Sequence, residues 1–199
     1  MKKTLGYFVL LFLIFACSSA NSETSSLREV IPNLKVLPIE YGAKNFKLDN
    51  LDIIITRANL PSEVAGYGDV YMVMYRQDGT WNLVQYPDHS YGTTAWPYTD
   101  EKPVSTVRFF TKLDGAGHKE TLYLLKAYRA LGKSIPEPSI ATFKLYKVQK
   151  NKDFGFIEFV LAGSMKTQKK YCNIDLALNE ALELPLPEAY VAGDNCVQK

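Results

Sequence analysis

The chain has 199 residues, a length that suits one folded domain together with a targeting segment. It contains 23 lysines and arginines and 21 aspartates and glutamates, and this near balance does not indicate the excess of basic residues typical of nucleic-acid binding. Two of the basic residues, Lys2 and Lys3, would leave with an N-terminal signal, so we expect a formally neutral mature chain.

The N-terminus combines those two lysines with an apolar run from Leu5 to Ala16. The run is shorter than the roughly 20 apolar residues that span a bilayer. A basic start followed by a short apolar run is typical of the first two regions of a secretory signal. We therefore predict that residues 1–16 are a signal peptide and that the protein is exported.

The end of this run, Ile14–Cys17, resembles the lipobox of bacterial lipoproteins, although Phe15 is larger than the residue usual there. The resemblance implies lipidation of Cys17, which then becomes the mature N-terminus and anchors the protein to the membrane without spanning it. Ser18 resembles the pattern sorted to the outer membrane, where the protein would face the periplasm or the surface. The alternative is cleavage after Ala20, which would give a periplasmic or secreted protein.

Residues 17–29 are Ser-rich and polar and are predicted to be a tether, followed by a single domain over residues 30–199. The segment Val30–Ile39 contains two prolines and suits at best an edge strand. The β-branched run Leu51–Arg57 predicts a strand.

The stretch Gly68–Tyr86 carries the clearest structural signal, two β-prone runs around Asp78-Gly79. This pair favours a tight hairpin turn because Gly adopts positive φ freely and Asp tolerates it. Adjacent residues of the first run, such as Val70 and Tyr71, are apolar, so both faces of this strand are largely apolar. We therefore expect this strand to lie in a sheet that is covered, at least in part, on both sides.

The segment Pro87–Pro103 has no strand or helix pattern and is predicted to be a long irregular loop. Three aromatic residues and two acids gather in it, and such groups suit a sugar, a peptide or a partner surface. The candidate binding residues are Tyr91, Trp96, Tyr98, Asp88 and Asp100. The alternative is that Trp96 simply packs the loop onto the sheet.

The second half of the chain adds more strands and one helix. Lys119–Lys133 suits a strand or a helix, and the neighbouring strands favour a strand at Glu120–Ala127. The other predicted elements are strands at Val104–Leu113 and Lys166–Cys172, a hairpin from Ile140–Gln149 and Phe154–Leu161, and a helix at Asp175–Leu184. About seven or eight short strands with a short C-terminal helix predict an all-β antiparallel sandwich.

Three cysteines are present, and the first would be lipidated or removed with the signal. Cys172 and Cys196 then remain, an even number in an oxidising compartment, which favours a disulfide that ties down the C-terminal tail. The bridge would close a loop of about 24 residues and stabilise the fold by about 3 kcal/mol. Two free thiols or a metal site are the alternatives.

Leu51–Pro61, a Gly-containing loop and Gly68–Val73 are together similar to the opening strands and first loop of C2 domains. The resemblance covers Leu51–Val73 only and implies a β-sandwich. Asp69 matches one calcium ligand of that family. No aspartate occupies the earlier ligand position, Val70 replaces the usual proline, and no later paired-aspartate loop follows, so calcium-dependent membrane binding is not implied.

Catalytic and metal chemistry find little support in the sequence. Asp88-His89-Ser90 holds the residue types of a hydrolase triad, but sequence neighbours cannot generally align as one, and no Gly-x-Ser-x-Gly elbow is present. Asp100 and the adjacent Glu101 do not form a glycosidase pair by themselves. A metal site would need both His89 and His118 from distant loops. We therefore expect no enzyme activity, no cofactor and no bound metal.

The predicted function is that of an exported cell-envelope lipoprotein with a non-catalytic binding or assembly role. A protein partner is favoured, and a carbohydrate- or lipid-binding module is the alternative, ahead of a secreted hydrolase. A small basic run, Lys166, Lys169 and Lys170, suits either a solvated strand face or contact with anionic lipid. An exposed sheet edge could also accept a partner strand.

Overall fold

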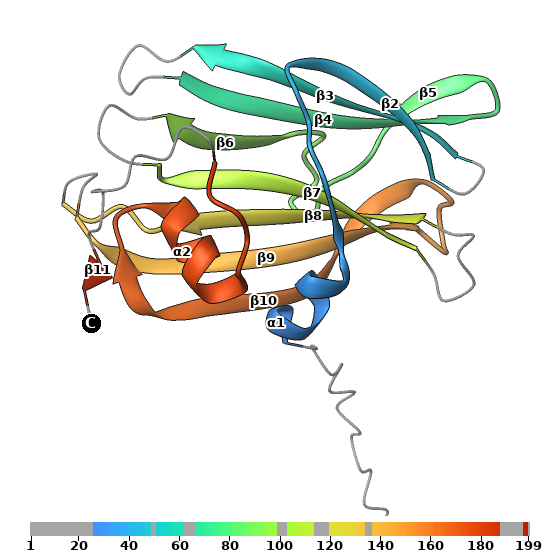
Figure 1. Ribbon diagram of the computed structural model, residues 1–199. Coiled ribbons are helices and arrows are strands. Elements are labelled where there is room, and N and C mark those ends of the chain that lie inside the picture. Colours follow the sequence, from blue (N-terminus) through green and yellow to red (C-terminus); the bar gives the residue numbers. More distant parts are fainter. Residues whose placement is uncertain are drawn as a thin grey trace, which may run out of the picture.

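The computed structural model describes residues 26–48, 51–61, 67–98, 103–113, 120–133, 137–187 and 197–198. These residues form two antiparallel sheets and a short C-terminal helix, which confirms the predicted all-β sandwich (Figure 1). In chain order the elements are α1 (Leu27–Val30), η1 (Ile31–Asn33), β1 (Lys35–Leu37), β2 (Gly42–Leu48), β3 (Leu51–Pro61), β4 (Tyr67–Gln77), β5 (Thr80–Leu83), β6 (Thr93–Tyr98), β7 (Ser105–Leu113), β8 (Glu120–Arg129), β9 (Ser139–Lys150), β10 (Ile157–Tyr171), α2 (Ile174–Leu182) and β11 (Val197–Gln198).

The six-stranded sheet, in the order β1-β7-β8-β9-β10-β11, is the middle layer of the molecule. One of its faces packs against the second sheet, in a core that includes Phe109, Leu124 and Phe159. The other face is covered by α1, η1 and α2, which lie in front of the sheet in Figure 1. Apolar residues on both faces of its strands reflect this double burial.

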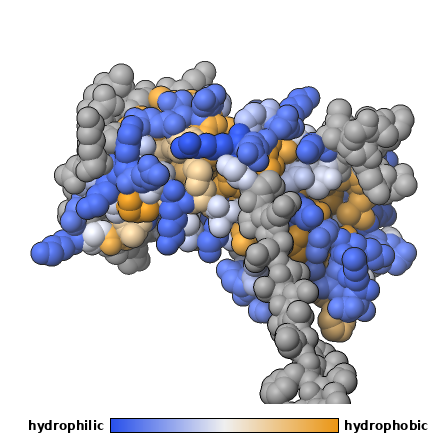
Figure 2. Space-filling model, turned by 90° about the horizontal axis from the view of Figure 1, so that it is seen from below, coloured by the Kyte–Doolittle hydropathy of each residue, from blue (hydrophilic) through white to orange (hydrophobic). Residues whose placement is uncertain are grey.

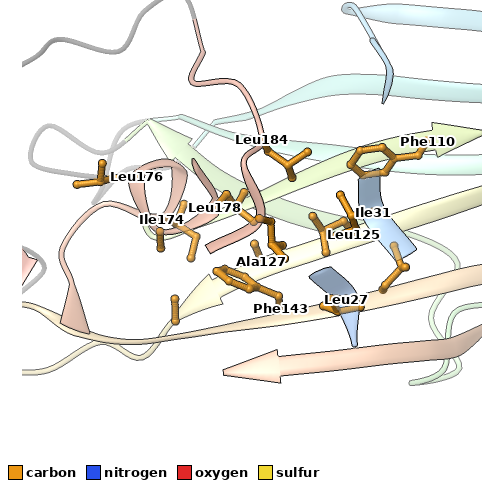
Figure 3. Packing of buried hydrophobic residues seen from close by; sticks show 14 of the residues in the cluster. Leu27, Ile31, Phe110, Leu125, Ala127, Phe143, Ile174, Leu176, Leu178 and Leu184 are labelled. Atoms are coloured by element: carbon orange, nitrogen blue, oxygen red, sulfur yellow. The ribbon is translucent and has the colours of Figure 1, made fainter. Parts of the chain in front are cut away.

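The core under the helices joins alternate residues of β8 and β9 to the apolar side of α2. Figure 3 shows Ala127 and Phe143 against Ile174 and Leu178, all of them almost completely buried. The helix begins where Asn173 accepts hydrogen bonds through Oδ1 from the backbone N–H groups of residues 175 and 176, which leaves fewer helix donors unpaired.

The second sheet has the order β2-β3-β4-β5, and β6 also pairs with β4. β5 and β6 share one edge of β4: β5 pairs with its end and β6 with its beginning. The predicted β4–β5 hairpin is confirmed, with Asp78 at φ 52° and Gly79 at φ 81° between the paired residues Gln77 and Thr80.

The expectation that both faces of the first hairpin strand are covered, at least in part, holds fully for one face and only partly for the other. Tyr71, Val73 and Tyr75 of β4 are buried between the sheets, whereas Met72 on the opposite face is 39% exposed. β4 is central within its sheet, but the helices cover the other sheet. The strands covered on both faces are those of the middle layer, such as β8 and β9.

Two further segments differ in part from the sequence prediction. Val30–Ile39 contains an edge strand, β1 of the six-stranded sheet, but the residues before β1 form a helical turn, with Pro32 in the first turn of η1, where its missing N–H is tolerated. Leu27 of α1 is 1% exposed, so the folded part of the chain includes residues that were assigned to the tether. The stretch Pro87–Pro103, predicted to be irregular, contains strand β6.

The surface around this core is mainly polar. Figure 2 shows hydrophilic side chains over most of the face seen from below, with hydrophobic residues between them in separate patches. Within the described residues, no helix is long and apolar enough to cross a membrane.

Candidate functional site

A cleft of about 480 Å³ lies between the two sheets, beside the part of the core that they share. One wall is the connection from β5 to β6, which contributes Tyr86, Pro87, Asp88, Gly92 and Thr93. The volume falls in the usual range of small-molecule sites, about 300–1,000 Å³. We refer to this feature as the inter-sheet cleft.

The connecting wall is held by hydrogen bonds at both ends of its turn. The backbone N–H of Tyr86 donates to Ser90 O at 2.9 Å, and the N–H of His89 donates to Tyr86 O at 2.9 Å. Just before the turn, Gln85 forms a parallel bridge with Glu158 of β10, so the connection is attached to both sheets. The wall is therefore positioned by backbone contacts before any ligand is present.

The opposite wall is formed by the inner face of β8 and β9, the face turned toward the second sheet. It contributes Leu124, Lys126, Tyr128, Lys144 and Tyr146. Leu124 belongs to the shared core, and the next inward positions of β8 are Lys126 and Tyr128. The inner face thus changes from apolar to basic and aromatic along the same strand.

The two lysines stand directly opposite each other in the antiparallel register of β8 and β9. Like charges at opposed positions destabilise a sheet. Among the described residues, neither ammonium forms an ion pair, although Lys144 Nζ lies 5.9 Å from the centre of the Tyr128 ring. The described part of the cleft therefore carries two positive charges that no salt bridge neutralises.

Asp88 supplies the one carboxylate of the cleft, at its exposed rim. A hydrogen bond from the Ser90 hydroxyl at 2.6 Å lowers the pKa of this carboxyl, and the charge of Lys126 lowers that pKa further. Asp88 is thus ionised at neutral pH. Its charge offsets only part of the positive charge of the two lysines.

Two buried hydroxyls on the connecting wall have no hydrogen-bond partner among the residues that the structure describes. Tyr86 is 5% exposed and Thr93 is 4% exposed, and Tyr86 Oη and Thr93 Oγ1 are both unpaired. Burial raises the pKa of the Tyr86 hydroxyl, as does the negative charge of Asp88, so this group stays protonated. A buried polar group without a partner costs about 1–3 kcal/mol.

The residues that the sequence singled out for binding are not brought together. Asp88 lines the cleft, while Tyr91 is 52% exposed and is not part of it. The ring of Trp96 lies over Gly68, where an added Cβ would come within 2.9 Å of it, so Trp96 packs on its own sheet. Tyr98 ends β6 and its side chain lies outside the described residues, as does Asp100.

The Asp88-His89-Ser90 sequence does not have the geometry of a catalytic triad. Ser90 Oγ donates directly to Asp88 Oδ1, and no hydrogen bond joins His89 to either residue. His89 has φ 61°, a left-handed conformation that closes the turn. His118 and Glu101 lie outside the described residues, and the described residues contain no group of three or more potential metal ligands.

Asp69, which matches a calcium ligand of C2 domains, is a buried structural ion pair. Its Oδ2 accepts from Arg57 Nη2 at 2.8 Å, and its Oδ1 accepts from the Tyr41 hydroxyl at 2.8 Å. The Arg57 guanidinium also stacks on the Tyr41 ring, 4.3 Å from its centre. Both carboxylate oxygens of Asp69 are therefore engaged by neighbouring side chains.

The predicted basic run is divided along β10. Lys169 forms an ion pair of 2.9 Å with Glu180 of α2, so it fastens the helix to the strand. A register shift between Lys166 and Lys170 places the run at a bulge, where the Thr167 hydroxyl accepts from the N–H of Ala141. The run is therefore not one continuous basic face.

Sequence reasoning missed four of the residues that give the cleft its chemistry, the two lysines and their neighbouring tyrosines. A weak signal for them is present in the chain: a lysine two residues before a tyrosine occurs at Lys126–Tyr128 and again at Lys144–Tyr146, as it also does at Lys169–Tyr171 outside the cleft. In a half-buried strand, a lysine on the covered face is rare enough to indicate a site.

No family model and no curated protein matches this chain. The crystal structure of CarG is similar to it in fold, with a TM-score of 0.59 and 15% sequence identity. The similar region covers 74% of this chain and 95% of the CarG chain. At this level of identity the likeness concerns the fold alone.

Proposed function

We propose that the protein is an exported cell-envelope protein that binds a small ligand in the inter-sheet cleft without chemically changing it. The observation that carries the proposal is a cleft of about 480 Å³ whose wall places two opposed lysines, without an ion pair among the described residues, beside two tyrosines. Lysines are rarely found on the covered face of a strand, so an opposed pair in a cavity indicates a place for another molecule.

The absence of an assembled nucleophile favours binding over catalysis. Ser90, the hydroxyl nearest to a histidine in the sequence, donates to Asp88 and also lies 2.9 Å from the Gly92 carbonyl oxygen. A serine nucleophile needs a neighbouring base that accepts its proton, and a carboxylate that merely orients the turn does not supply one. The Asp88–Ser90 contact thus serves to shape the connecting wall.

Co-purification tests the binding role. The protein is purified from the envelope fraction and denatured, and the released small molecules are identified by mass spectrometry. We expect wild-type protein and the Tyr91→Ala variant to release the same compound, and Tyr146→Ala to lose most of it, because Tyr146 lines the cleft and Tyr91 does not. If the three preparations release the same compounds, or none, the cleft is not the ligand site.

The membrane anchor belongs to the same proposal and has a separate test. The signal-like residues 1–16 and the lipobox-like Cys17 support lipidation at the outer membrane, with a free periplasmic or secreted form as the alternative. Cys17→Ala should move the protein from the membrane fraction to the soluble fraction. A variant that stays in the membrane with unchanged mobility on gels would contradict the anchor.

The Cys172–Cys196 disulfide is also proposed. Cys172 is fully buried directly after β10, and β11 returns along this strand with Val197 paired to Tyr171. The sequence places Cys196 immediately before Val197, and Cys196 itself lies outside the described residues. Alkylation of the denatured, unreduced protein should leave both thiols unlabelled, whereas labelling of either one would contradict the bridge.

A second candidate function, binding of an envelope protein, is favoured by the outer face of the second sheet. Met72, Trp81 and Leu83 are about 40% exposed there, on neighbouring strands β4 and β5. Photocrosslinking in cells from position 83 should then trap one protein that is not trapped from position 147, an exposed site on the other sheet. Equal products from the two positions would contradict this role.

A further inference from the structure

We infer that the ligand of the inter-sheet cleft is a small organic monocarboxylate, held with its carboxylate between the ammonium groups of Lys126 and Lys144. The inference rests on the proposed binding role and names the chemical class of the molecule bound. It follows from two features of the cleft: an opposed pair of lysines and an aromatic wall.

The lysine pair requires an anion. Lys126 and Lys144 occupy opposed positions on a partly covered face, and among the described residues neither ammonium forms an ion pair. Two like charges placed together in a partly dry site repel more strongly than they would in water. A carboxylate between them removes the repulsion and accepts a charge-assisted hydrogen bond from each ammonium.

The other residues that line the cleft indicate the chemistry of the uncharged part of the ligand. The rings of Tyr128 and Tyr146 and the side chain of Leu124 offer apolar surface next to the lysines. Across the cleft, Tyr86 and Thr93 line the connecting wall, but their hydroxyl oxygens are covered and offer no open surface for hydrogen bonding. A flat or ring-containing acid therefore fits the aromatic wall next to the lysines.

The rim carboxylate limits the charge of the ligand. Asp88 is ionised and faces the field of Lys126, so the cleft holds two positive charges against one negative charge. A single negative charge on the ligand balances the site. A phosphate or sulfate dianion would instead meet repulsion from Asp88 and would leave the aromatic wall without a partner.

Three probe ligands distinguish the effect of ligand charge from that of ligand shape. Each is titrated into the mature protein at low ionic strength, and binding is measured by NMR or calorimetry. Benzoate carries the ring and the carboxylate, benzamide has the same shape without the charge, and sulfate has the charge without the ring. We expect benzoate to bind at least tenfold more tightly than benzamide or sulfate. Lys126→Met and Lys144→Met should each weaken benzoate binding at least tenfold.

Lys147→Met is the matched control, because Lys147 lies on the same strand, is exposed and does not line the cleft. It should leave benzoate binding unchanged. A second readout needs no ligand: at low ionic strength Lys144→Met should raise the melting temperature, since it removes the repulsion, and Lys147→Met should not. A Lys144→Met variant that melts no higher than Lys147→Met would overturn the repulsion on which the inference rests.

The outcomes distinguish the inference from the binding role beneath it. If benzamide binds as tightly as benzoate and the lysine variants do not change the affinity, the ligand does not need a carboxylate, although the cleft still binds a ligand. If sulfate binds as tightly as benzoate, the cleft is an inorganic-anion site, and the prediction of an organic ligand is wrong. If no probe binds, or Tyr146→Ala leaves the binding of every probe unchanged, the inference and the binding role both fail.

Discussion

Adjacent residues of strands β8 and β9 lie on opposite faces of the sheet, and the two faces have different environments. On one face Ala127 and Phe143 are fully buried under α2, in a cluster of apolar residues. On the other face Lys126 and Lys144 line a cleft together with tyrosines. Successive side chains of a strand point to opposite faces, so one pair of strands builds a structural core and a binding wall at once.

The difference shows where stability and function separate in this fold. The helix-covered face contributes stability through buried apolar area, and its buried polar groups, such as Asn173, Asp175 and Thr167, form hydrogen bonds or ion pairs within the protein. The cleft face contains groups that cost stability in the absence of a ligand, the two opposed ammoniums of Lys126 and Lys144. Changes on the first face should therefore reduce stability, and changes on the second should reduce binding.

Truncation on the helix-covered face should have the largest effect. Phe143→Ala removes a ring that is fully buried against α2, and we expect a loss of about 3–5 kcal/mol in the free energy of unfolding. Denaturant unfolding measures it. Thr142→Ala changes the next residue, on the cleft face, and should cost less than about 1 kcal/mol. Equal losses of unfolding free energy in the two variants would contradict the claim that the helix-covered face contributes more stability than the cleft face.

Removal of the helix cap should have the next largest effect. Asn173→Ala deletes the oxygen that accepts from two backbone N–H groups at the start of α2, and we expect a loss of about 1 kcal/mol. Asn173→Ser keeps a capping oxygen and should retain most of the stability. A Ser variant as unstable as the Ala variant would show that the cap is not the reason.

A cleft hydroxyl should behave in the opposite way. Thr93→Val keeps the shape of the side chain and removes an unpaired buried hydroxyl, so we expect a gain of up to about 1 kcal/mol in the free energy of unfolding. A loss of stability on this substitution would mean that the hydroxyl already has a partner in the folded protein.

The smallest effect concerns pH and the attachment of α2 to β10. The hydrogen bond from Lys169, followed by that from the Tyr171 hydroxyl, lowers the pKa of Glu180. A lowered carboxyl pKa gives stability that is present above the unfolded pKa, about 4.3, and is lost as the pH falls through the folded pKa. Glu180→Gln should flatten this loss in unfolding curves measured at acid pH, and an unchanged pH dependence would exclude the contact.

The fold was predictable where the signal is local. The hairpin at Asp78-Gly79 follows from the backbone freedom of two residues, and α2 follows from apolar residues at helical spacing before a proline. β6 was missed because Trp96 and its neighbours carry no alternating pattern, and their pairing with β4 fixes them as a strand. Long-range pairing overrides weak local preference in such segments.

The candidate site was less predictable, because it assembles residues that are distant in the chain. Asp88 was identified from the connecting segment, whereas its partners across the cleft come from β8 and β9, about 40–60 residues later. Tyr91 and Trp96 are close to Asp88 in sequence and do not share the cleft with it. Aromatic residues in a loop-like segment are a weak guide to a site when their side chains face away from it.

The sequence by itself determined the sandwich class, the first hairpin and the late helix, whereas it left the segment that forms β8 open between a strand and a helix. It could not determine which face of each strand is covered, because that depends on which layer packs against it. Only the tertiary structure decided that Leu122–Tyr128 runs from the shared core into a cleft. The alternation is a property of the strand, whereas burial is a property of two surfaces brought together by the fold.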